Sequence, residues 1–234
     1  MKFAIIAAGE GSRLSQEGIE LPKPLVRLNG EAMIDRLIRI FNENEAEEIC
    51  IIVNTLHPQT EAHVRTLMEK HEGAPIKLVV KSTPSSMHSF FELSPFLHDA
   101  PFCLTTVDTI FREDEFKAYI QAFKASEADG MMAVTDYIDD EKPLYVATDK
   151  HLNITGFLDQ SDSCRFISGG IYALKPIALK TLERCMEEGQ SRMRNFQRGL
   201  VSDGLQLKAW PMSKILDVDH AGDIIKAEDF LNGK

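Results

Sequence analysis

The chain has few cysteines and no long apolar run. Its 234 residues include 4 cysteines, none of them in a CxxC pair. Cys50 and Cys103 stand inside apolar runs, where a small buried thiol is the ordinary explanation. No apolar run approaches the roughly 18 residues of a membrane span, and Met1 leads into an apolar segment without a signal peptide. We therefore expect a soluble, cytoplasmic protein with reduced cysteines and no membrane partner.

Positive charge is also scarce. The chain has 26 Lys and Arg against 36 Asp and Glu, a formal net charge of −10. This balance argues against nonspecific binding of nucleic acid, so functional cations should be concentrated in one pocket. The 7 histidines show neither HxH nor HExxH spacing, which disfavours a zinc site. No Ser or Cys nucleophile motif is evident.

The order of the apolar segments predicts the fold class. A near-continuous apolar run at residues 3–8 is typical of a parallel strand covered on both faces. An apolar stripe at 34–41 then predicts a helix that packs on a sheet. Further strands are expected at 48–54, 76–81, 102–107 and 131–134, with helices at 60–71, 87–97 and around 116–123. This alternation predicts an α/β protein with a Rossmann-like, doubly wound, mostly parallel sheet and helices on both faces.

After about residue 140 the pattern changes. Short strand-like segments follow at 145–148, 154–158 and 166–174, then helices, a last strand near 205–210 and a final helix. No linker rich in Ser, Gly or Pro separates the two parts, and a chain of this length can bury one substantial core. We expect a single domain over residues 1–234, with halves at about 1–135 and about 136–234.

The most informative segment is a glycine-rich loop after the first strand, where residues 7–26 read AAGEGSRLSQEGIELPKPLV. Its two glycines, at positions 9 and 11, let backbone N–H groups approach phosphate oxygens. Arg13 can contact two oxygens at once, and Lys23, between two prolines, adds a mobile positive charge. A dinucleotide fingerprint needs a third glycine where Leu14 stands, and the Gly-Lys-Ser/Thr of a P-loop is absent. The residues expected to bind a nucleoside triphosphate here are Ala7, Ala8, Gly9, Glu10, Gly11, Ser12, Arg13 and Lys23.

This segment resembles the signature of the nucleotidyltransferases that make nucleotide sugars, the NDP-sugar pyrophosphorylase or sugar-1-phosphate nucleotidylyltransferase family. That signature is G-x-G-[ST]-R-[LM] followed by P-K-P-[LM], matched here by residues 9–14 and 22–25. The resemblance extends along most of the chain. It implies an enzyme of the EC 2.7.7 class, in which a sugar 1-phosphate or similar phosphomonoester attacks the α-phosphate of a nucleoside triphosphate. The products would be an NDP-sugar, or a CDP-alcohol, and pyrophosphate.

The resemblance also implies roles for the parts of the chain. The half at about 1–135 would bind the nucleotide and the half at about 136–234 the acceptor. Some members continue into a left-handed β-helix, and we expect none after Lys234. Such transfers depend on positioning and charge neutralisation. Arg13 would stabilise the departing pyrophosphate, and Lys23 would bridge the α-phosphate and the incoming phosphate.

Three aspartates are candidate ligands for Mg²⁺, the expected cofactor. Asp108 ends an apolar run and should lie at the carboxyl end of a strand, where such sheets bind ligands. An aspartate there can also be a turn former, and the resemblance implies that it binds Mg²⁺. Asp217 and Asp219 alternate along an extended stretch, so both should point the same way while Val218 points into the core. That stretch resembles the family's D-[IV]-D-T-P-E-D-L segment. We expect Asp108 and Asp219 to bind Mg²⁺, with Asp217 as the alternative to Asp219 and Asp223 as the cap of the final helix.

The base is less clearly specified. Ser85 and Ser86 lie where family members contact the base, although helix capping is an alternative role for these hydroxyls. The glutamine and the Gly-[TL]-A pattern of sugar pyrophosphorylases are missing. The segment is nearer to the looser N-x-x-S-L type of cytidylyltransferase-like members.

The acceptor segment also departs from the family pattern. Ser168, Gly169 and Gly170 resemble the start of its N-[AS]-G-I-Y motif, where glycine permits close approach of a sugar. Family members carry an E-K-P motif before this segment, and its lysine often contacts the sugar phosphate. This chain has no such motif, and Asp159 stands near its place. We take these four residues as the acceptor-binding candidates. The cations that would replace the missing lysine are Arg165, Arg192, Arg194 or Arg198, of which at least two are expected on a solvated helix face.

These departures leave a second function open, a catalytically silent nucleotide-binding or regulatory module of the same fold. A third, a dinucleotide-dependent oxidoreductase, is disfavoured by Leu14. The expected partners are a nucleoside triphosphate and a sugar phosphate or other phosphomonoester, with no nucleic acid. The sequence leaves the oligomeric state open, and a homo-oligomer is compatible with it.

Overall fold

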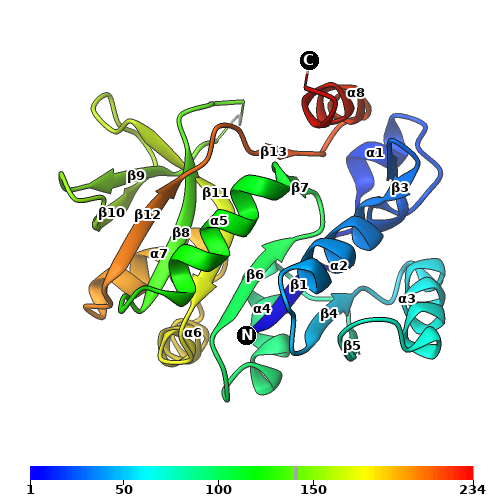
Figure 1. Ribbon diagram of the computed structural model, residues 1–234, viewed down its shortest axis with the longest axis horizontal. Coiled ribbons are helices and arrows are strands. Elements are labelled where there is room, and N and C mark those ends of the chain that lie inside the picture. Colours follow the sequence, from blue (N-terminus) through cyan, green and yellow to red (C-terminus); the bar gives the residue numbers. More distant parts are fainter. Residues whose placement is uncertain (140–141, 234) are drawn as a thin grey trace.

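The computed structural model describes residues 1–139 and 142–233. A large sheet runs through the molecule, with helices on both of its faces (Figure 1). The strands of this sheet are β1 (Lys2–Ala7), β4 (Ile49–Val53), β5 (Ile76–Val80), β6 (Phe102–Thr106), β8 (Gly130–Thr135), β9 (Tyr145–Thr148), β10 (Ile154–Leu158), β11 (Phe166–Leu174) and β12 (Leu207–Pro211). Two short ribbons complete the strand set: β2 (Arg27–Leu28) with β3 (Glu31–Ala32), and β7 (Thr109–Ile110) with β13 (Leu216–Asp217).

The strand order confirms the predicted fold class. It runs β10-β9-β11-β6-β1-β4-β5, and β8 pairs with both β11 and β12. β1 is parallel to β4 and β6, and β4 is parallel to β5. β11 is antiparallel to β6, β8 and β9, so the sheet is mixed beyond β6. The result is an α/β fold with a mixed, mostly parallel sheet flanked by helices.

The helices divide between the two faces of the sheet. They are α1 (Ser12–Gln16), α2 (Met33–Glu43), α3 (Pro58–Lys70), α4 (Ser86–Leu93), α5 (Glu113–Lys124), α6 (Ala178–Glu187), α7 (Met193–Ser202) and α8 (Ala221–Leu231). One face of β1 presents Phe3 and Ile5 to a core that α2, α3, α5 and α8 complete. The other face presents Ala4 and Ile6 to a core shared with α4, α6 and α7. Successive strand residues point to opposite faces, so a continuous apolar run supplies both cores.

Several short elements were not predicted from the sequence, and two of them shape the site. The first is α1, which begins at Ser12 inside the glycine-rich loop. The second is the ribbon of β7 and β13, which joins segments far apart in the chain. Asp223 lies in the first turn of α8 and caps it by accepting hydrogen bonds from the amides of Asp219 (3.1 Å) and His220 (2.8 Å). Asp223 is therefore a residue of the first helical turn that bonds the amides preceding the helix, as in a capping box.

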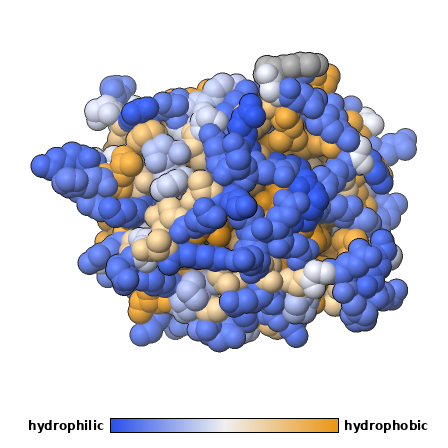
Figure 2. Space-filling model, in the orientation of Figure 1, coloured by the Kyte–Doolittle hydropathy of each residue, from blue (hydrophilic) through white to orange (hydrophobic). Residues whose placement is uncertain are grey.

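The surface is mostly polar. In the orientation of Figure 1, hydrophilic residues cover most of the visible face and hydrophobic residues show only in patches between them (Figure 2). Within the described ranges, no helix combines the length and the apolar character that a membrane crossing requires.

Candidate active site

The predicted nucleotide residues line a cavity of about 300 Å³, which we call the loop cavity. It lies at the carboxyl ends of β1 and β6, the edge at which parallel sheets of this type bind ligands. Of the predicted residues it brings together Ala7, Ala8, Gly9, Glu10, Lys23, Ser85, Ser86 and Asp108. Gly11, Ser12 and Arg13 are outside its lining, because the chain turns into α1 at this point. The loop cavity therefore joins the glycine-rich loop to the start of α4.

Two contacts shape the glycine-rich loop. Gly11 has a left-handed φ of 64°, and a Cβ there would lie 3.1 Å from the Cβ of Lys23. A glycine is thus required for the close approach of these two segments. Asn54, at the end of β4, is buried, and its Nδ2 donates to the carbonyl O of Gly9 at 2.8 Å. The sequence reasoning missed Asn54, although a polar residue at the carboxyl end of an apolar strand is a usable signal.

Lys23 is the centre of the site. Its ammonium contacts the carboxylate of Asp108 and lies 2.8 Å from Oδ1 of Asp219. Arg13 reaches the other oxygen of Asp219, with Nη1 3.2 Å from Oδ2. Burial opposes the charge on Lys23, but the two carboxylates outweigh it and raise the pKa of the ammonium. The pKa of Asp219 is lowered, because its contacts with Lys23 and the charge of Arg13 outweigh the effect of burial. The four residues that were predicted to bind phosphate or metal thus form one charged cluster.

The β7–β13 ribbon brings the aspartates together. Asp217 is paired with Thr109, and the amide of Val218 donates to the carbonyl O of Asp108 at 3.1 Å. Val218 is fully buried, as the alternation predicts. The Asp217 carboxylate faces an open cavity, yet the protein atoms around it and the charges of Asp108 and Asp219 raise its pKa to about 8. The charge of Lys23 lowers the pKa of Asp217, but it does not outweigh burial and the two neighbouring carboxylates.

The opening beside Asp217 is a second cavity of about 460 Å³, which we call the ribbon cavity. Its lining includes Asp217 and Asp219 together with two of the predicted acceptor residues, Ser168 and Gly169. Its other lining residues are Arg13, Thr135, Tyr137, Asp139, Lys142, Ile167, Ile215, Leu216, His220, Asp223 and Lys226. Because Lys23 and Asp108 line the loop cavity, the charged cluster separates the two cavities.

Each glycine of the predicted acceptor segment has its own structural reason: close packing at Gly169 and a left-handed backbone at Gly170. A Cβ at Gly169 would lie 2.1 Å from Cδ1 of Ile215, a residue of the cavity wall. Gly170 adopts a φ of 73°, at an irregularity in the pairing of β11 with β8, and does not line the cavity. Ser168 donates its hydroxyl hydrogen to Oε1 of the buried Gln197 at 2.9 Å. Gln197 is a second residue that the sequence reasoning missed, and nothing in its sequence context singles it out.

Asp159 lies apart from the other acceptor candidates. It lines a separate, larger cavity of about 930 Å³ and forms ion pairs with Arg194 (2.5 Å) and Arg198 (2.7 Å). Arg192 lines the same cavity, whereas Arg165 pairs with Asp136 at 3.2 Å. Arg194 and Arg198, two of the four arginines expected to replace the missing E-K-P lysine, are therefore paired with Asp159.

A second link holds α8 against the glycine-rich loop. The carboxylate of Glu17, just after α1, accepts a hydrogen bond from the amide of Ala221 at 2.6 Å. Its other oxygen lies 2.6 Å from Nδ1 of His220. The His220 contact lowers the pKa of Glu17, and the Glu17 carboxylate raises the pKa of His220. This link places Asp219, directly before His220, beside Arg13.

Two of the three candidate metal ligands, Asp108 and Asp219, converge on one cation. Among residues 1–139 and 142–233, no group of three or more His, Cys, Asp or Glu side chains is arranged to hold a metal ion. Instead, Asp108 and Asp219 both contact the single ammonium of Lys23. Two carboxylates that converge on one cation are the oxygen donors that Mg²⁺ takes when substrate phosphates supply its other ligands. The side chains of Asp108 and Asp219 therefore fit this ion in the presence of a phosphorylated substrate.

Three solved structures with the same fold carry the names of nucleotidyltransferases. The putative glucose-1-phosphate thymidylyltransferase from Bacillus anthracis has a TM-score of 0.85 and 16% identity, over 100% of this chain and 96% of that one. The inositol-1-phosphate CTP transferase from T. maritima has a TM-score of 0.77 and 17% identity, over 97% and 96%. The CTP:phosphocholine cytidylyltransferase from Streptococcus pneumoniae (LicC) has a TM-score of 0.75 and 18% identity, over 98% of each chain.

The similar structures carry the names of sugar-1-phosphate and phospho-alcohol nucleotidyltransferases, and they share the fold of this chain. At such low identity they show the fold alone. The sequence itself matches the family model of the MobA-like NTP transferase domain over residues 3–193. Because this match covers most of the chain, the protein belongs to the family of MobA-like NTP transferase domains.

Proposed function

We propose that the protein is a Mg²⁺-dependent nucleotidyltransferase that joins a nucleoside triphosphate to a sugar 1-phosphate or similar phosphomonoester. The loop cavity would hold the nucleotide, and the ribbon cavity would hold the acceptor. An oxygen of the acceptor phosphate would attack the α-phosphorus, and the bond from that phosphorus to the β-phosphate oxygen would break, releasing pyrophosphate. The products would be an NDP-sugar, or a CDP-alcohol if the acceptor is an alcohol phosphate.

The position of Lys23 carries this proposal. Lys23 lines the loop cavity, and its partner Asp219 lines the ribbon cavity. A cation at this boundary would contact the phosphates of both substrates and neutralise charge that develops during transfer. In the absence of substrate, Asp108 and Asp219 neutralise Lys23. When phosphates enter, the ammonium would turn from these carboxylates to the α-phosphate and the acceptor phosphate. Arg13 lines the ribbon cavity and pairs with Asp219, so its expected role at the departing pyrophosphate requires the triphosphate to extend past Asp219.

Mg²⁺ would bind to the carboxylates that Lys23 releases. Asp108 and Asp219 would hold it together with substrate phosphates, and Asp217 is the alternative to Asp219. When bound, the ion would neutralise phosphate charge and orient the two substrates. Burial and the charges of Asp108 and Asp219 raise the pKa of Asp217, and a divalent cation bound at the ribbon would offset these neighbouring charges.

A pyrophosphate-release assay tests the proposal. CTP, UTP, dTTP, GTP and ATP are each mixed with Mg²⁺ and one of glucose 1-phosphate, inositol 1-phosphate or phosphocholine. These acceptors are the ones that the names of the similar structures give. We expect pyrophosphate only when a triphosphate and an acceptor are both present, with the joined product visible by mass spectrometry.

The silent-module alternative predicts a different result. A nucleotide would raise the melting temperature through binding to the native state, but no combination would release pyrophosphate. Thermal shifts measured on the same samples therefore separate a binding module from an enzyme. The variant Asp108→Asn serves as the control, since it should lose Mg²⁺-dependent turnover and stay folded.

A further inference from the structure

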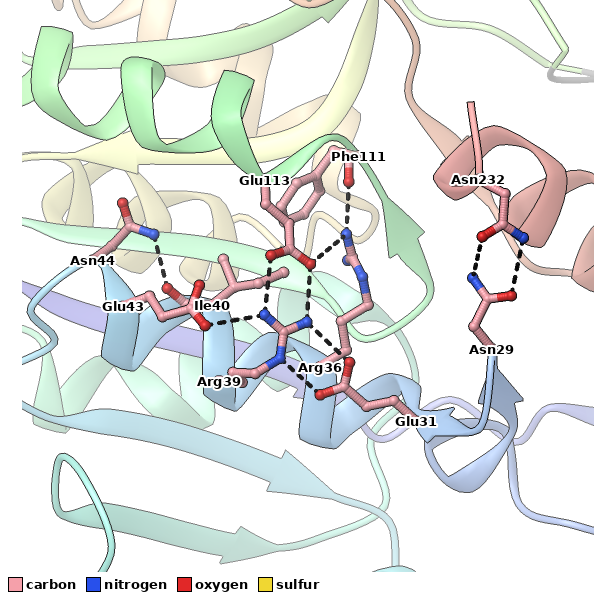
Figure 3. Close-up of polar contacts among 10 residues, drawn as sticks. All are labelled: Asn29, Glu31, Arg36, Arg39, Ile40, Glu43, Asn44, Phe111, Glu113 and Asn232. Atoms are coloured by element: carbon pink, nitrogen blue, oxygen red, sulfur yellow. Dashed lines mark hydrogen bonds and ion pairs between the residues drawn. The ribbon is translucent and has the colours of Figure 1, made fainter. Parts of the chain in front are cut away.

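Helix α2 carries a buried arginine that reaches the segment after β7 (Figure 3). Arg36 is only 3% exposed, and its Nη2 donates to the carbonyl O of Phe111 at 2.7 Å. Its guanidinium lies 5.2 Å from the centre of the Phe111 ring. The carboxylate of Glu113 is more distant, with 3.7 Å between Oε1 and the same Nη2. The main polar partner of Arg36 is therefore a backbone carbonyl.

Stabilisation of the fold does not account for this arginine. Its Nη1 is buried with no hydrogen-bond partner among the described residues. A buried guanidinium with an unpaired donor costs free energy, and buried ion pairs can often be replaced by apolar side chains without loss of stability. An apolar residue of similar length would fill the space beside Phe111 at lower cost. What Arg36 adds is a directed link between α2 and the backbone.

Hydrogen bonds connect α2 to both of the segments that carry Lys23 and Asp108. The first amide of α2, that of Met33, donates to the carbonyl O of Val26 at 2.9 Å, in the turn that contains Lys23. The helix is thus bonded to the Lys23 turn at its start and, through Arg36, to the chain just after β7. The β7 strand itself directly follows Asp108. Any movement of Phe111 relative to α2 would change the position of Asp108 relative to Lys23.

The neighbouring arginine works differently. Arg39 forms paired contacts with Glu31 (2.9 Å for both bonds) and with Glu113 (2.9 and 3.0 Å), and a single one with Glu43 (3.1 Å), as Figure 3 shows. All of these partners are side chains, and Arg39 is 39% exposed. Such exposed pairs contribute little to stability individually. Of the two arginines, Arg36 is the one that hydrogen-bonds the backbone after β7.

We propose that Arg36 is a positioning residue, which holds the backbone after Asp108 at a fixed place relative to the Lys23 turn. It thereby sets the distance between the Asp108 carboxylate and the Lys23 ammonium. The catalytic consequence rests on the proposed function. The geometric consequence, a less tightly held β7–β13 ribbon without Arg36, does not depend on it.

Three variants isolate the backbone link. Arg36→Met keeps much of the side-chain volume and removes both the charge and the donor to Phe111. Arg36→Lys keeps the charge and a single donor. Arg39→Met, on the same helix, removes the contacts with three carboxylates and leaves the Phe111 bond intact, so it is the matched control.

Hydrogen exchange in the metal-free protein gives the first readout. The reporter is the amide of Val218, which donates to the carbonyl O of Asp108. In Arg36→Met we expect this amide to exchange at least about ten-fold faster, with an unchanged or higher melting temperature and unchanged exchange in β1 and β4. Arg36→Lys should lie between Arg36→Met and wild type. Arg39→Met should match wild type at Val218.

Turnover gives the second readout. In Arg36→Met we expect kcat to fall roughly 10- to 100-fold with both KM values little changed, since misplaced groups slow the chemical step. Wild-type exchange at Val218 in Arg36→Met would overturn the proposal. So would faster exchange throughout the sheet with a lower melting temperature, because Arg36 would then stabilise the fold generally. If the wild type releases no pyrophosphate, the proposed function fails, and the exchange measurement still decides the role of Arg36.

Discussion

The ammonium of Lys23 lies 2.8 Å from Oδ1 of Asp219, although 196 positions separate the two residues in the chain. This contact joins the turn after the glycine-rich loop to the segment ahead of the last helix. It exists because β13 pairs with β7 and because Glu17 holds the start of α8. Two cavities consequently meet at one charged cluster.

Asn54 is expected to support nucleotide binding. Its Nδ2 bonds to the carbonyl O of Gly9, and its Oδ1 accepts from the amides of Leu56 and His57. Asn54→Ala removes three partly buried hydrogen bonds to the backbone, each typically contributing about 0.5–1.5 kcal/mol. We predict that the KM for the nucleotide rises about ten-fold while the KM for the acceptor changes little. Steady-state kinetics measure both constants.

The neighbouring Thr55→Ala is the control for Asn54, since Thr55 is exposed and contacts only Ser82 among the described residues. It should leave both constants unchanged. An equal rise of both KM values in Asn54→Ala would contradict a role confined to the glycine-rich loop.

Asp217→Asn is expected to stabilise the metal-free protein at high pH. The folded state raises the pKa of Asp217 to about 8, so it retains a proton that the unfolded chain has released. Its contribution to stability is therefore largest below about pH 4, and it is lost as the pH rises through about 8. In EDTA at pH 9 the variant should melt at least about 2 °C above wild type, the shift for roughly 1 kcal/mol in a chain of this size.

That difference should vanish below about pH 3, where Asp217 is protonated in both states. With Mg²⁺ at pH 9 the wild type should gain more stability than the variant, since the ion neutralises the carboxylate. A variant less stable than wild type at every pH in EDTA would show that the Asp217 charge is not repelled by its neighbours.

Gly169→Ala should damage the ribbon cavity selectively. The added Cβ would meet Cδ1 of Ile215 at 2.1 Å and the carbonyl O of Ala133 at 3.1 Å. Ile215 is part of the wall of the ribbon cavity, so the added Cβ would displace this wall. Overpacking of this kind typically costs about 1–3 kcal/mol. We predict a lower melting temperature and at least a five-fold rise in the KM for the acceptor, on the order of 1 kcal/mol.

Gly156→Ala, in β10, is the matched control for Gly169. A Cβ there meets no atom within 4 Å, and the backbone has no left-handed φ. Its melting temperature and kinetics should match wild type. If Gly169→Ala raised only the KM for the nucleotide, the assignment of the ribbon cavity to the acceptor would be wrong.

Local sequence patterns predicted much of the fold because the pattern and the element coincide. The ranges expected at 145–148, 154–158 and 166–174 are the observed β9, β10 and β11. The stripe at 34–41 lies within α2, whose buried residues face the sheet. Such patterns depend on neighbours close in the chain, so one sequence suffices to read them.

The parts that were missed depend on contacts between distant segments. The strands of the β7–β13 ribbon are two residues long, too short to leave a periodic signal. Asp159 was grouped with Ser168 by its place in a motif, but its ion pairs to α7 place it in another cavity. Arg36 has the sequence context of an ordinary surface helix, and only the packing of Phe111 against it shows that it is buried.

The central claim is that Lys23 acts on both phosphates during transfer, and one measurement tests it directly. Turnover of Lys23→Met is compared with wild type at saturating triphosphate, acceptor and Mg²⁺, with the exposed Lys77→Met as the control. Loss of a preorganised cation typically costs about 2.7–4 kcal/mol in the transition state. We predict that kcat of Lys23→Met falls roughly 100- to 1000-fold while Lys77→Met stays at the wild-type rate. A kcat within a few-fold of wild type would contradict the account.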